Sequence, residues 1–307
     1  MVEFVIINYN TGELTCQCIE SIFDTYSRNA LINIVDNASA DDSVKYISDR
    51  YPQLAIIRNE QNYGYAKAVN IGVRTTSSEL VLVSNSDVTF HPNSINIAAQ
   101  MLKDDAGIGV SGFFQYFPDG RPQRSYGSFP GYKLGLMDML LLTNIQEQLS
   151  GLVRKIRVNS NKIKEVEYAD GAALMIRREI FDKLNGFDEN FFFYTEETDF
   201  CKRVKNLGYR VVLNSRAVIT HIRGAGSGSQ KYNEKAELML IRTKIQYILK
   251  HGSRIEAGFF KYAESFHFLM ISIIERVFSF LKFKNRLKYK NGIYYQIFKL
   301  WLRTKID

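Results

Sequence analysis

Cysteine is scarce in this chain, and its three copies form no recognisable pattern. Cys16, Cys18 and Cys201 are an odd number, and their spacing does not match that of a metal site. Cys16 and Cys18 are two residues apart on a predicted helix, so their side chains would not face each other. A disulfide framework is therefore not expected, and reduced thiols in a cytoplasmic compartment are the simplest interpretation.

A secretory leader and a long apolar run are also missing. Met1 leads directly into the strand-like segment Val2–Asn8, without a basic leader and a cleavage site, so no signal peptide is expected. No apolar run reaches the roughly 18–20 residues that a helix needs to span a bilayer. An apolar content of 46% with 23% charged residues argues against a disordered chain and predicts a globular protein with a full core.

Acidic residues are almost missing from the C-terminal segment. From Arg276 onward there are nine Lys and Arg residues and one acid, Asp307, in a chain of net charge +8. Aromatic residues are interleaved with basic ones over a longer stretch: Phe259, Phe260, Tyr262, Phe266, Phe268, Phe278, Phe280 and Phe283. Basic, aromatic, amphipathic helices are suited to lying on an anionic membrane surface. The alternative is that these rings pack against the rest of the chain or against a second subunit, which would make a homo-oligomer.

The first hundred residues contain an alternation of strand and helix patterns. Short apolar runs predict strands at Val2–Asn8, Leu31–Asp36, 55–59 and 79–85, and apolar residues at helical spacing lie between them. This rhythm predicts a mostly parallel sheet with helices on both faces. Because ligands of such sheets lie beyond the carboxyl ends of the strands, the polar segments that follow these strands are candidate site residues.

The alternation loosens after Pro92. We expect a long loop or irregular strands at 113–130, a helix and then a mobile polar stretch at 137–164, strands at 171–176 and 209–214, and an edge strand at 216–220. The Gly- and Ser-rich residues 224–229 are typical of a linker or closing loop, and helices are predicted beyond them. The expected organisation is a domain at 1–225 followed by a helical region at 226–307.

Residues 186–203 place three carboxylates at a predicted helix start. An aromatic run is followed by Glu196, Glu197 and Asp199, and Thr195 is the predicted N-cap. The acids could serve only the helix, because its dipole favours negative charge in the first turn and Asp199 could pair with Arg203. A carboxylate cluster at the end of a buried aromatic segment is also how a general base is positioned. Both interpretations stay open on these residues alone.

Further candidate ligands follow the predicted strands. Asp87 could bind a divalent cation, which prefers oxygen ligands, or could cap a turn. Asp36 could accept a hydrogen bond from a ribose hydroxyl or a base, while Ser39 could cap the next helix. Gly64 precedes a helix whose N-terminus could face an anion.

Two basic residues follow the strand predicted at 216–220. His221 could complete a metal site together with Asp87, or could be an ordinary surface or core histidine. Arg223 could neutralise a phosphate, or could be solvated. The glycine fingerprint G-x-G-x-x-G is absent at 62–72, which argues against a dinucleotide-dependent oxidoreductase. A nucleic-acid binder would not need acids at the strand ends, since they repel phosphate unless a metal intervenes.

Taken in order, these motifs resemble glycosyltransferase family 2, and within it the bacterial rhamnosyltransferase-like enzymes of cell-surface polysaccharide assembly. The resemblance covers about the first 225 residues. It is carried by Asn8-Tyr-Asn10, Asp36-Asn-Ala-Ser-Ala-Asp41, Asn62-x-Gly64, Asn85-x-Asp87, Gly186-Phe-Asp-Glu189, Glu196-x-x-Asp199 and His221-x-x-Gly224.

The resemblance implies a GT-A fold, a nucleotide-sugar donor, a divalent Mn²⁺ or Mg²⁺ ion and inversion at the anomeric carbon. It implies that Asp87 and His221 bind the metal, and that Glu197 is the base with Asp199 and Glu196 in reserve. The implied nucleotide-sugar contacts are Tyr9, Asn10, Asp36, Asn37, Asn62, Gly64, Asn85, Asp87 and Arg223. It further implies dTDP-rhamnose as donor, a polyprenyl-diphosphate-linked saccharide acceptor, a product such as O-antigen or capsule, and a peripheral location on the inner face of a bacterial membrane.

Two positions depart from the family's pattern. Asn85 stands where the paired metal motif has its first carboxylate, so Asp87 would be alone there. Glu196-Glu197 stands where relatives usually have Glu-Asp, so the base would be one methylene longer. Since misplacement by about an ångström can cost a rate factor of roughly 10², a catalytically degenerate relative that binds nucleotide sugar or glycan without transfer is the alternative function.

Overall fold

The computed structural model describes residues 1–142, 162–222, 233–280 and 292–306, with the side chains of 278–280 excepted. The chain divides into two compact units. The first unit comprises Met1–Ser128 and Arg154–Gln230, and the second comprises Phe129–Val153 and Lys231–Asp307. Residues 129–153 thus group with the C-terminal helices, although they lie within the sequence range 1–225 expected for the first domain.

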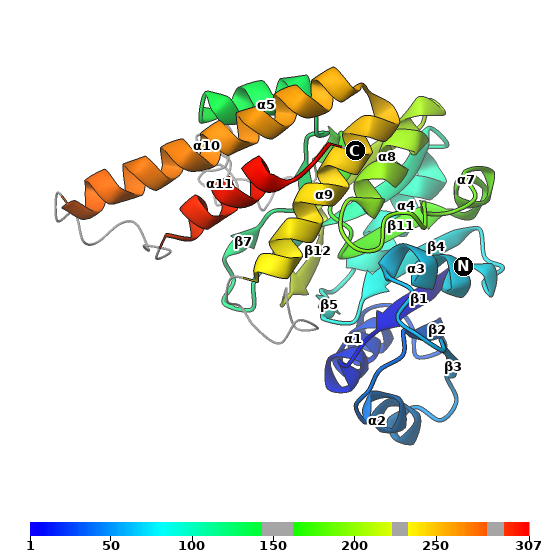
Figure 1. The fold of residues 1–307 in the computed structure, drawn as a ribbon. Coiled ribbons are helices and arrows are strands. Elements are labelled where there is room, and N and C mark those ends of the chain that lie inside the picture. The colour runs from blue at the N-terminus through cyan, green and yellow to red at the C-terminus, as the bar shows by residue number, and fades with distance from the viewer. Residues whose placement is uncertain (143–161, 223–232, 281–291, 307) are drawn as a thin grey trace. The chain divides into compact units, whose positions relative to one another are not determined.

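The N-terminal half of the first unit is the predicted βαβ arrangement. Strands β1 (Val2–Asn8), β2 (Leu31–Asp36), β3 (Ala55–Arg58) and β4 (Leu80–Asn85) are parallel and lie in the order β3-β2-β1-β4. They alternate with helices α1 (Gly12–Thr25), α2 (Ser43–Arg50) and α3 (Tyr65–Arg74) (Figure 1). The helix and strand periodicities therefore predicted this half of the unit to within a few residues at each boundary.

The second half completes a ten-stranded sheet in the described part of the chain. Its strands are β5 (Val88–Phe90), β6 (Ile108–Tyr116), β7 (Pro122–Gln123), β9 (Ile163–Val166), β11 (Ala173–Arg177) and β12 (Arg210–His221). Beyond β4 the sheet continues as β11-β6-β12-β5, and β11 is antiparallel to both of its neighbours. β8 (Tyr126–Gly127) and β10 (Tyr168–Ala169) form a separate small sheet. The helices here are α4 (Ser94–Asp104), α7 (Arg178–Lys183) and α8 (Glu196–Asn206).

Between the two alternatives expected for residues 113–130, a long loop or irregular strands, the structure shows strands: β6 runs on to Tyr116 and pairs with both β12 and β7, and the short strands β7 and β8 follow. One predicted element differs from the structure. Residues 216–220 are not an edge strand: they belong to the 12-residue β12, which lies between β6 and β5. A register shift between Asn214 and Val218 lets the one strand continue through this segment. The predicted mobile stretch falls largely on residues 143–161, which lie outside the described residues.

Helices cover both faces of the sheet, so its central strands are largely buried and mostly apolar. Every residue of β1 is buried. One face packs against α1, α2 and α4 through a core that includes Phe4, Ile22 and Leu102. On the other face Gly72 of α3 lies so close to the sheet that an added Cβ would come within 2.4 Å of Val5. The start of α3 lies next to the end of β2, because Asn37, which follows β2, donates to the Gly64 carbonyl (3.2 Å).

The second unit is helical in its described part. It contains α5 (Tyr132–Met139), α9 (Glu234–His251), α10 (Arg254–Phe280) and α11 (Ile293–Arg303), and α10 contacts the other three. Phe260 and the single tryptophan of the chain, Trp301, pack edge to face and are buried. Within the described residues, no helix combines the length and apolar character needed to cross a membrane.

Four groups that can carry charge lie together inside the helical unit. Glu264 of α10 is buried, its carboxylate lies 3.6 Å from Lys244 of α9, and His267 contacts the backbone carbonyl of Asp138 on α5. Burial raises the pKa of Glu264 to about 8, although Lys244 lowers it and the neighbouring Asp138 raises it further. Glu264 is therefore largely protonated in the folded unit at neutral pH.

We expect the helical unit to lose stability between pH 4.5 and about 8 because of Glu264. Below pH 4.5 both the folded and the unfolded chain are protonated there. As pH rises, the unfolded carboxylate ionises first, and this favours unfolding until the folded carboxylate also ionises near pH 8. The free energy of unfolding, followed through Trp301 fluorescence, should fall by about 2–3 kcal/mol more in wild type than in Glu264→Gln between pH 5.5 and 8.

Glu234→Gln makes the same chemical change at an exposed position in the first turn of α9 and serves as control. Its pH dependence should follow wild type. A Glu264→Gln protein with the wild-type pH dependence would show that Glu264 is already ionised at neutral pH.

Candidate active site

The ends of three parallel strands bring the candidate polar residues to one edge of the sheet. Asn8 at the end of β1 pairs with Asp36 at the end of β2, and Ile7 pairs with Asn85 at the end of β4. Asp87 follows two residues later. This edge is the usual position of ligands in sheets of this kind.

Asp36 is held by a compact set of hydrogen bonds. It is 1% exposed and accepts hydrogen bonds from Asn8 Nδ2 (2.7 Å), Ser39 Oγ (2.6 Å) and the Ser39 backbone amide (3.1 Å). Ser39 is thus engaged with Asp36 and does not cap the next helix, which begins at Ser43 with Asp42 at its N-cap. The alternative role considered for Ser39 is therefore wrong.

The loop after β1 contains a turn at Asn10, which is hydrogen-bonded to Ser39 and Ala40. Asn10 has a φ of 55°, its amide donates to Ser39 Oγ (2.9 Å), and its side-chain oxygen accepts from the Ala40 amide (2.8 Å). Tyr9 is 38% exposed. Tyr9 is therefore accessible to a ligand, whereas Asn10 shapes the turn that presents it.

Asn37 connects the end of β2 to the loop before α3. Its Nδ2 donates to Asn62 Oδ1 (2.9 Å) and to the Gly64 carbonyl (3.2 Å). Its Oδ1 accepts from Asn59 Nδ2 (2.9 Å) and from the Tyr63 amide (3.1 Å). These four bonds use the full capacity of a side-chain amide, so Asn37 and Asn62 hold this loop in shape.

Gly64 joins this loop to the carboxylate segment. It has a φ of 83°, and an added Cβ would lie 2.3 Å from the carbonyl oxygen of Phe192. The amide of Tyr65, the next residue, donates to that same oxygen (2.8 Å). Only glycine allows this approach, which fixes the start of α3 against the loop that leads into α8.

Helix α8 begins at Glu196 with Thr195 at its N-cap, as predicted, but the capping hydrogen bond is not made. Thr195 occupies the N-cap position with a φ of 71° and makes no capping hydrogen bond through its side chain. Tyr194 is also left-handed, with a φ of 72°. Two successive non-glycine residues in this region store strain, which is common where a loop presents functional groups.

Asp199 serves the structure of α8. It is fully buried, and its Oδ2 lies 2.7 Å from Nε of Arg203. The same guanidinium donates to the carbonyls of Leu184 (3.0 Å) and Gly186 (2.9 Å). Asp199 and Arg203 therefore form the ion pair foreseen from their spacing, and together they tie α8 to the turn before it.

Replacing Asp199 with asparagine is expected to destabilise the protein without a specific effect on chemistry. The change leaves the Arg203 charge partly buried and uncompensated, which should lower the free energy of unfolding by roughly 1.5–3 kcal/mol. Asp182→Asn is the matched control, since Asp182 pairs with Arg178 at the same spacing but is exposed. A loss of turnover in Asp199→Asn at unchanged stability would return Asp199 to the list of candidate bases.

The first two acids of α8 have strongly perturbed environments. Glu196 is 5% exposed, and among the described residues its Oε2 has no hydrogen-bond partner. Burial, and then the charge of Glu197, hold its pKa well above 4.5. Burial and the charge of Asp170 raise the pKa of Glu197 to about 7. Burial therefore favours the neutral form of Glu196, while Glu197 can exchange a proton near neutral pH.

Tyr65 shows which acids share this region. Its hydroxyl donates to the Gly171 carbonyl (3.3 Å), and a Cβ on Gly171 would lie 3.2 Å from the Glu197 side chain. The pKa of Tyr65 is raised well above 10, first by burial and then by four neighbouring carboxylates: Glu196, Glu197, Asp87 and Asp170. The acid after β4 and the acids of α8 thus lie around one buried ring.

His221 completes this arrangement through the pairing of β12 with β5. His221 is opposite Val88 in the register, and the Ile222 amide donates to the Asp87 carbonyl (3.1 Å). As a result His221 Nε2 lies 3.3 Å from Asp87 Oδ1, and both side chains are about nine-tenths buried or more. Within the described residues there is no cluster of three or more acidic, His or Cys ligands, so Asp87 and His221 would be a two-residue donor set.

Several residues of this network were not predicted. Asp170, Gln115 and Gln123 link His221 to the acids: Gln115 Nε2 donates to Asp170 Oδ1 (3.0 Å), and both glutamines contact the imidazole. Asp170 directly precedes the predicted strand at 171–176, a position that the other strand ends could have suggested. The glutamines lie in the segment predicted as a long loop or irregular strands, and no sequence pattern there indicated a functional role for them. Arg223 and the loop 224–229 lie outside the described residues.

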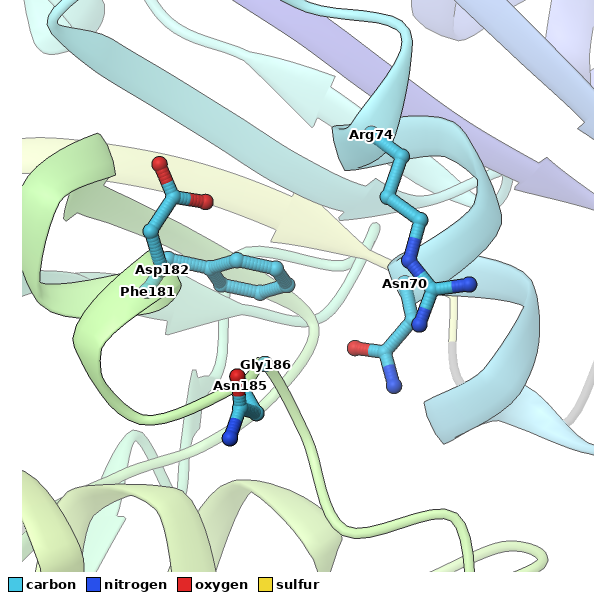
Figure 2. Close-up of a pocket in the computed structure, with 6 residues that line it drawn as sticks. All are labelled: Asn70, Arg74, Phe181, Asp182, Asn185 and Gly186. Atoms are coloured by element: carbon cyan, nitrogen blue, oxygen red, sulfur yellow. The ribbon is translucent and has the colours of Figure 1, made fainter.

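A cavity of about 290 Å³ lies elsewhere in the unit, and no predicted site residue lines it. Figure 2 shows Arg74 and Asn70 of α3 facing Phe181, Asp182, Asn185 and Gly186 across it. Asn70 Nδ2 donates to the Phe187 carbonyl (2.9 Å), and Asn70 Oδ1 accepts from the Phe187 amide (2.8 Å). The groups here hold the segment 186–189 against α3, which is a structural task.

Comparison with known proteins agrees with this arrangement. Residues 3–184 match the family described as Glycosyl transferase family 2, and residues 154–223 match the N-terminal domain of galactosyltransferase. The chain is 25% identical to the N-acetylglucosaminyl-diphospho-decaprenol L-rhamnosyltransferase of Mycobacterium tuberculosis, over 73% of this chain and 76% of that protein. It is also 25% identical to the low-salt glycan biosynthesis hexosyltransferase Agl10 of Haloferax volcanii, over 66% and 60%.

Solved structures share the fold at low sequence identity. The mannosyltransferase PcManGT from Pyrobaculum calidifontis, in complex with GDP-Man and Mn²⁺, has a TM-score of 0.58 at 15% identity and covers 98% of this chain and 84% of its own. S. aureus TarS 1–349 in complex with UDP-GlcNAc has a TM-score of 0.52 at 17% identity, over 96% and 81%. The strand order, the acids at the strand ends and the match over more than half of the sequence lead to one conclusion: this chain belongs to glycosyltransferase family 2 and has a GT-A fold.

Proposed function

We propose that this glycosyltransferase is a metal-dependent, inverting enzyme that transfers a sugar from a nucleoside-diphosphate donor to a saccharide acceptor. One observation carries the proposal: Asp87, which lies 3.3 Å from His221, and the acids Glu196 and Glu197 are all close enough to Tyr65 for their charges to raise its pKa. A cation-binding pair next to a carboxylate of pKa about 7 is the combination that such a transfer needs.

Asp87 and His221 are the residues proposed to hold the cation. Their donor atoms, an oxygen and a nitrogen 3.3 Å apart, suit Mn²⁺, whereas Mg²⁺ would be bound mainly by the carboxylate oxygen. Two protein ligands are enough, because such ions complete their shell with phosphate oxygens and water. When bound, the cation would offset the charge that develops on the leaving diphosphate. Asn85 has no carboxylate, which leaves Asp87 as the acidic ligand after β4.

Glu197 is the proposed general base. With a pKa of about 7 it can be ionised before reaction and accept the proton of the attacking acceptor hydroxyl. Asp199 is engaged with Arg203, and burial raises the pKa of Glu196 and disfavours its ionised form, so neither is as well suited. Attack from the face opposite the diphosphate would invert the anomeric centre.

The nucleotide is proposed to lie over the ends of β1 and β2. Tyr9 is exposed there, and Asp36 is fixed by Ser39 and Asn8 so that an acceptor oxygen is held in place for a ribose hydroxyl or a base. Asn10, Asn37, Asn62, Gly64 and Asn85 would shape this surface, and Arg223 would face the diphosphate.

The relatives support the proposed donor and acceptor classes. The mycobacterial relative is named for rhamnose transfer to a diphospho-decaprenol acceptor, which supports dTDP-rhamnose as donor and a polyprenyl-diphosphate-linked saccharide as acceptor. The product would then be a cell-surface polysaccharide such as O-antigen or capsule.

We also propose, as the sequence indicated, that a catalytic domain at 1–225 is followed by a helical region at 226–307.

A lipid-linked acceptor would place the helical unit at the membrane, on its inner face. α10 presents an exposed apolar stripe with spacings of seven and four residues: Ile255, Tyr262, Phe266, Ile273 and Val277. Phe260 is buried in the unit, so part of the aromatic set packs internally as in the alternative; the side chains of Phe278, Phe280 and Phe283 lie outside the described part. An apolar stripe that is followed by the basic segment from Arg276 onward supports peripheral contact with anionic lipid.

Vesicle sedimentation tests this contact. Tyr262→Ser/Phe266→Ser should bind anionic vesicles more weakly than wild type, and truncation at residue 255 should remove binding. Unchanged binding would refute the membrane role. Loss of a dimer in the double variant, measured by light scattering, would instead identify the stripe as an interface between two copies of the chain.

Product formation tests the proposed function. A thermal-shift screen of nucleotides and nucleotide sugars with and without Mn²⁺ should identify a donor that stabilises the protein more when Mn²⁺ is present. Transfer from that donor to a polyprenyl-diphosphate saccharide should then be detectable. The replacement of the first metal-motif carboxylate by Asn85 favours one rival, a non-catalytic binder. Binding without any product would support that rival.

A further inference from the structure

Two buried glutamines contact the same nitrogen of His221. Gln115 of β6 and Gln123 of β7 are directly opposite each other in the register, and each is 2% exposed. Their Oε1 atoms lie 3.0 Å and 3.1 Å from His221 Nδ1. We call these two residues the glutamine pair.

The opposite end of each amide is anchored to an atom that can only accept. Gln115 Nε2 donates to Asp170 Oδ1 (3.0 Å), and Gln123 Nε2 donates to the His221 backbone carbonyl (3.0 Å). Turning either amide over would bring its oxygen against a carboxylate or carbonyl oxygen at that distance, which is repulsive. Both anchors therefore direct the amide oxygens toward Nδ1.

This orientation decides the tautomer of the imidazole. Nδ1 faces two acceptor oxygens, so it has to carry the hydrogen and donate it. Nε2 then turns its lone pair toward Asp87 Oδ1, 3.3 Å away. Two atoms with lone pairs repel each other at this distance unless a positive charge lies between them, and such an arrangement is suited to a bound cation.

We propose that Gln115 and Gln123 are positioning residues that hold His221 as the Nδ1–H tautomer, so that Nε2 is available with Asp87 to bind a divalent cation. The cation part of this inference rests on the proposed function. Because outer-sphere partners of a metal-binding histidine orient the ring and raise its basicity, their loss typically weakens metal affinity by roughly 10–100-fold. The tautomer part concerns the protein without any cation.

The first test is the tautomer of His221 in the cation-free protein. The chain has four histidines, so ¹⁵N-detected imidazole spectra are simple, and the His221 signals are assigned by their loss in His221→Gln. Wild type should show a protonated Nδ1 and an unprotonated Nε2. Gln115→Met/Gln123→Met keeps the side-chain volume but removes both acceptors, and it should populate the Nε2–H form.

The second test is Mn²⁺ affinity measured by titration without donor sugar. The double variant should bind Mn²⁺ about 10–100-fold more weakly than wild type, with smaller losses in the two single variants. Gln100→Met makes the same change on the exposed surface of α4 and should match wild type. If the double variant does not fold, both measurements are made on the single variants and on Asp170→Asn. This isosteric change removes the carboxylate that anchors the Gln115 amide.

The outcomes separate this inference from the function on which it rests. An unchanged tautomer together with unchanged Mn²⁺ affinity in the double variant would overturn the role of the glutamine pair. A wild-type protein that binds no Mn²⁺ would refute the cation site of the proposed function. The tautomer spectra would still decide what the glutamine pair does to His221.

Discussion

Asp87→Ala is expected to abolish cation-stimulated sugar transfer. Asp87 is the carboxylate that follows β4 beside His221, and Asn85 offers no second acid there. Stabilisation of a leaving diphosphate by a cation is worth several kcal/mol, so kcat/KM in the presence of Mn²⁺ should fall by roughly 10³-fold. The measurement is the initial rate of transfer over a range of Mn²⁺ concentrations.

Two further variants show whether the effect is specific. Asp87→Asn keeps the shape of the side chain and tests whether the loss comes from charge rather than from a folding defect. Asp49→Ala removes an exposed acid from α2 and should leave the rate and its Mn²⁺ dependence as in wild type. Transfer by Asp87→Ala with an unaltered Mn²⁺ response would remove Asp87 from the proposed site.

Glu197→Gln should lower kcat by roughly 10²–10⁴-fold, the usual contribution of a general base. Glutamine preserves size and polarity but cannot accept the proton of the acceptor hydroxyl. Binding of the nucleotide sugar should be unchanged, because the base acts on the acceptor. Single-turnover rates together with donor binding by calorimetry separate these two effects.

The pH dependence gives an independent signature of the same residue. Burial and Asp170 raise the pKa of Glu197 to about 7, and a base works only when ionised. In wild type, kcat/KM should therefore rise with pH through about 7 and then level off. Glu197→Gln should lose this rise, whereas Glu179→Gln, at an exposed position of α7, should keep it.

Variants of the two neighbouring acids then discriminate between them. Glu197→Asp keeps a carboxylate but shortens its reach by a methylene, so it should retain more activity than Glu197→Gln while losing up to about 10²-fold. Glu196→Gln should retain the pH profile, because burial raises the pKa of Glu196 and favours its neutral form, which glutamine resembles. A larger loss of kcat in Glu196→Gln than in Glu197→Gln would assign the base to Glu196.

Much of the first half of the fold could be predicted because its signals are local. The residues of β1 and β2 are apolar in short runs, and the helices between them repeat apolar residues at helical spacing, so their boundaries agree with the structure closely. Asp36 and Asp87 could be recognised because parallel strands end at the same edge of a sheet. The ion pair Asp199–Arg203 could also be predicted from local spacing, since residues four apart on a helix are neighbours.

The residues that were missed depend on contacts between distant parts of the chain. Gln115 reaches Asp170 across 55 positions and His221 across 106. Gln115 lies in a segment rich in Gly, Pro and aromatic residues, a composition that predicted a long loop or irregular strands. In the structure, pairing with β12 and β7 extends β6 as far as Tyr116. Threonine is a common helix-capping residue, and for that reason Thr195 was predicted to cap α8. In the structure Thr195 lies in the loop that contacts Gly64 through Phe192, and the backbone of Thr195 is left-handed there.

The sequence by itself determined the alternating strands and helices, the acids that follow β2 and β4, and the resemblance that identified the family. Each of these depends on residues close together in the chain or on the order of motifs along it. Only the tertiary structure decided that the Asp199–Arg203 pair ties α8 to the carbonyls of Leu184 and Gly186, that His221 meets Asp87, and that two glutamines select its tautomer. These depend on hydrogen bonds and charges between separate segments of the chain, whose partners become defined only when the fold is assembled.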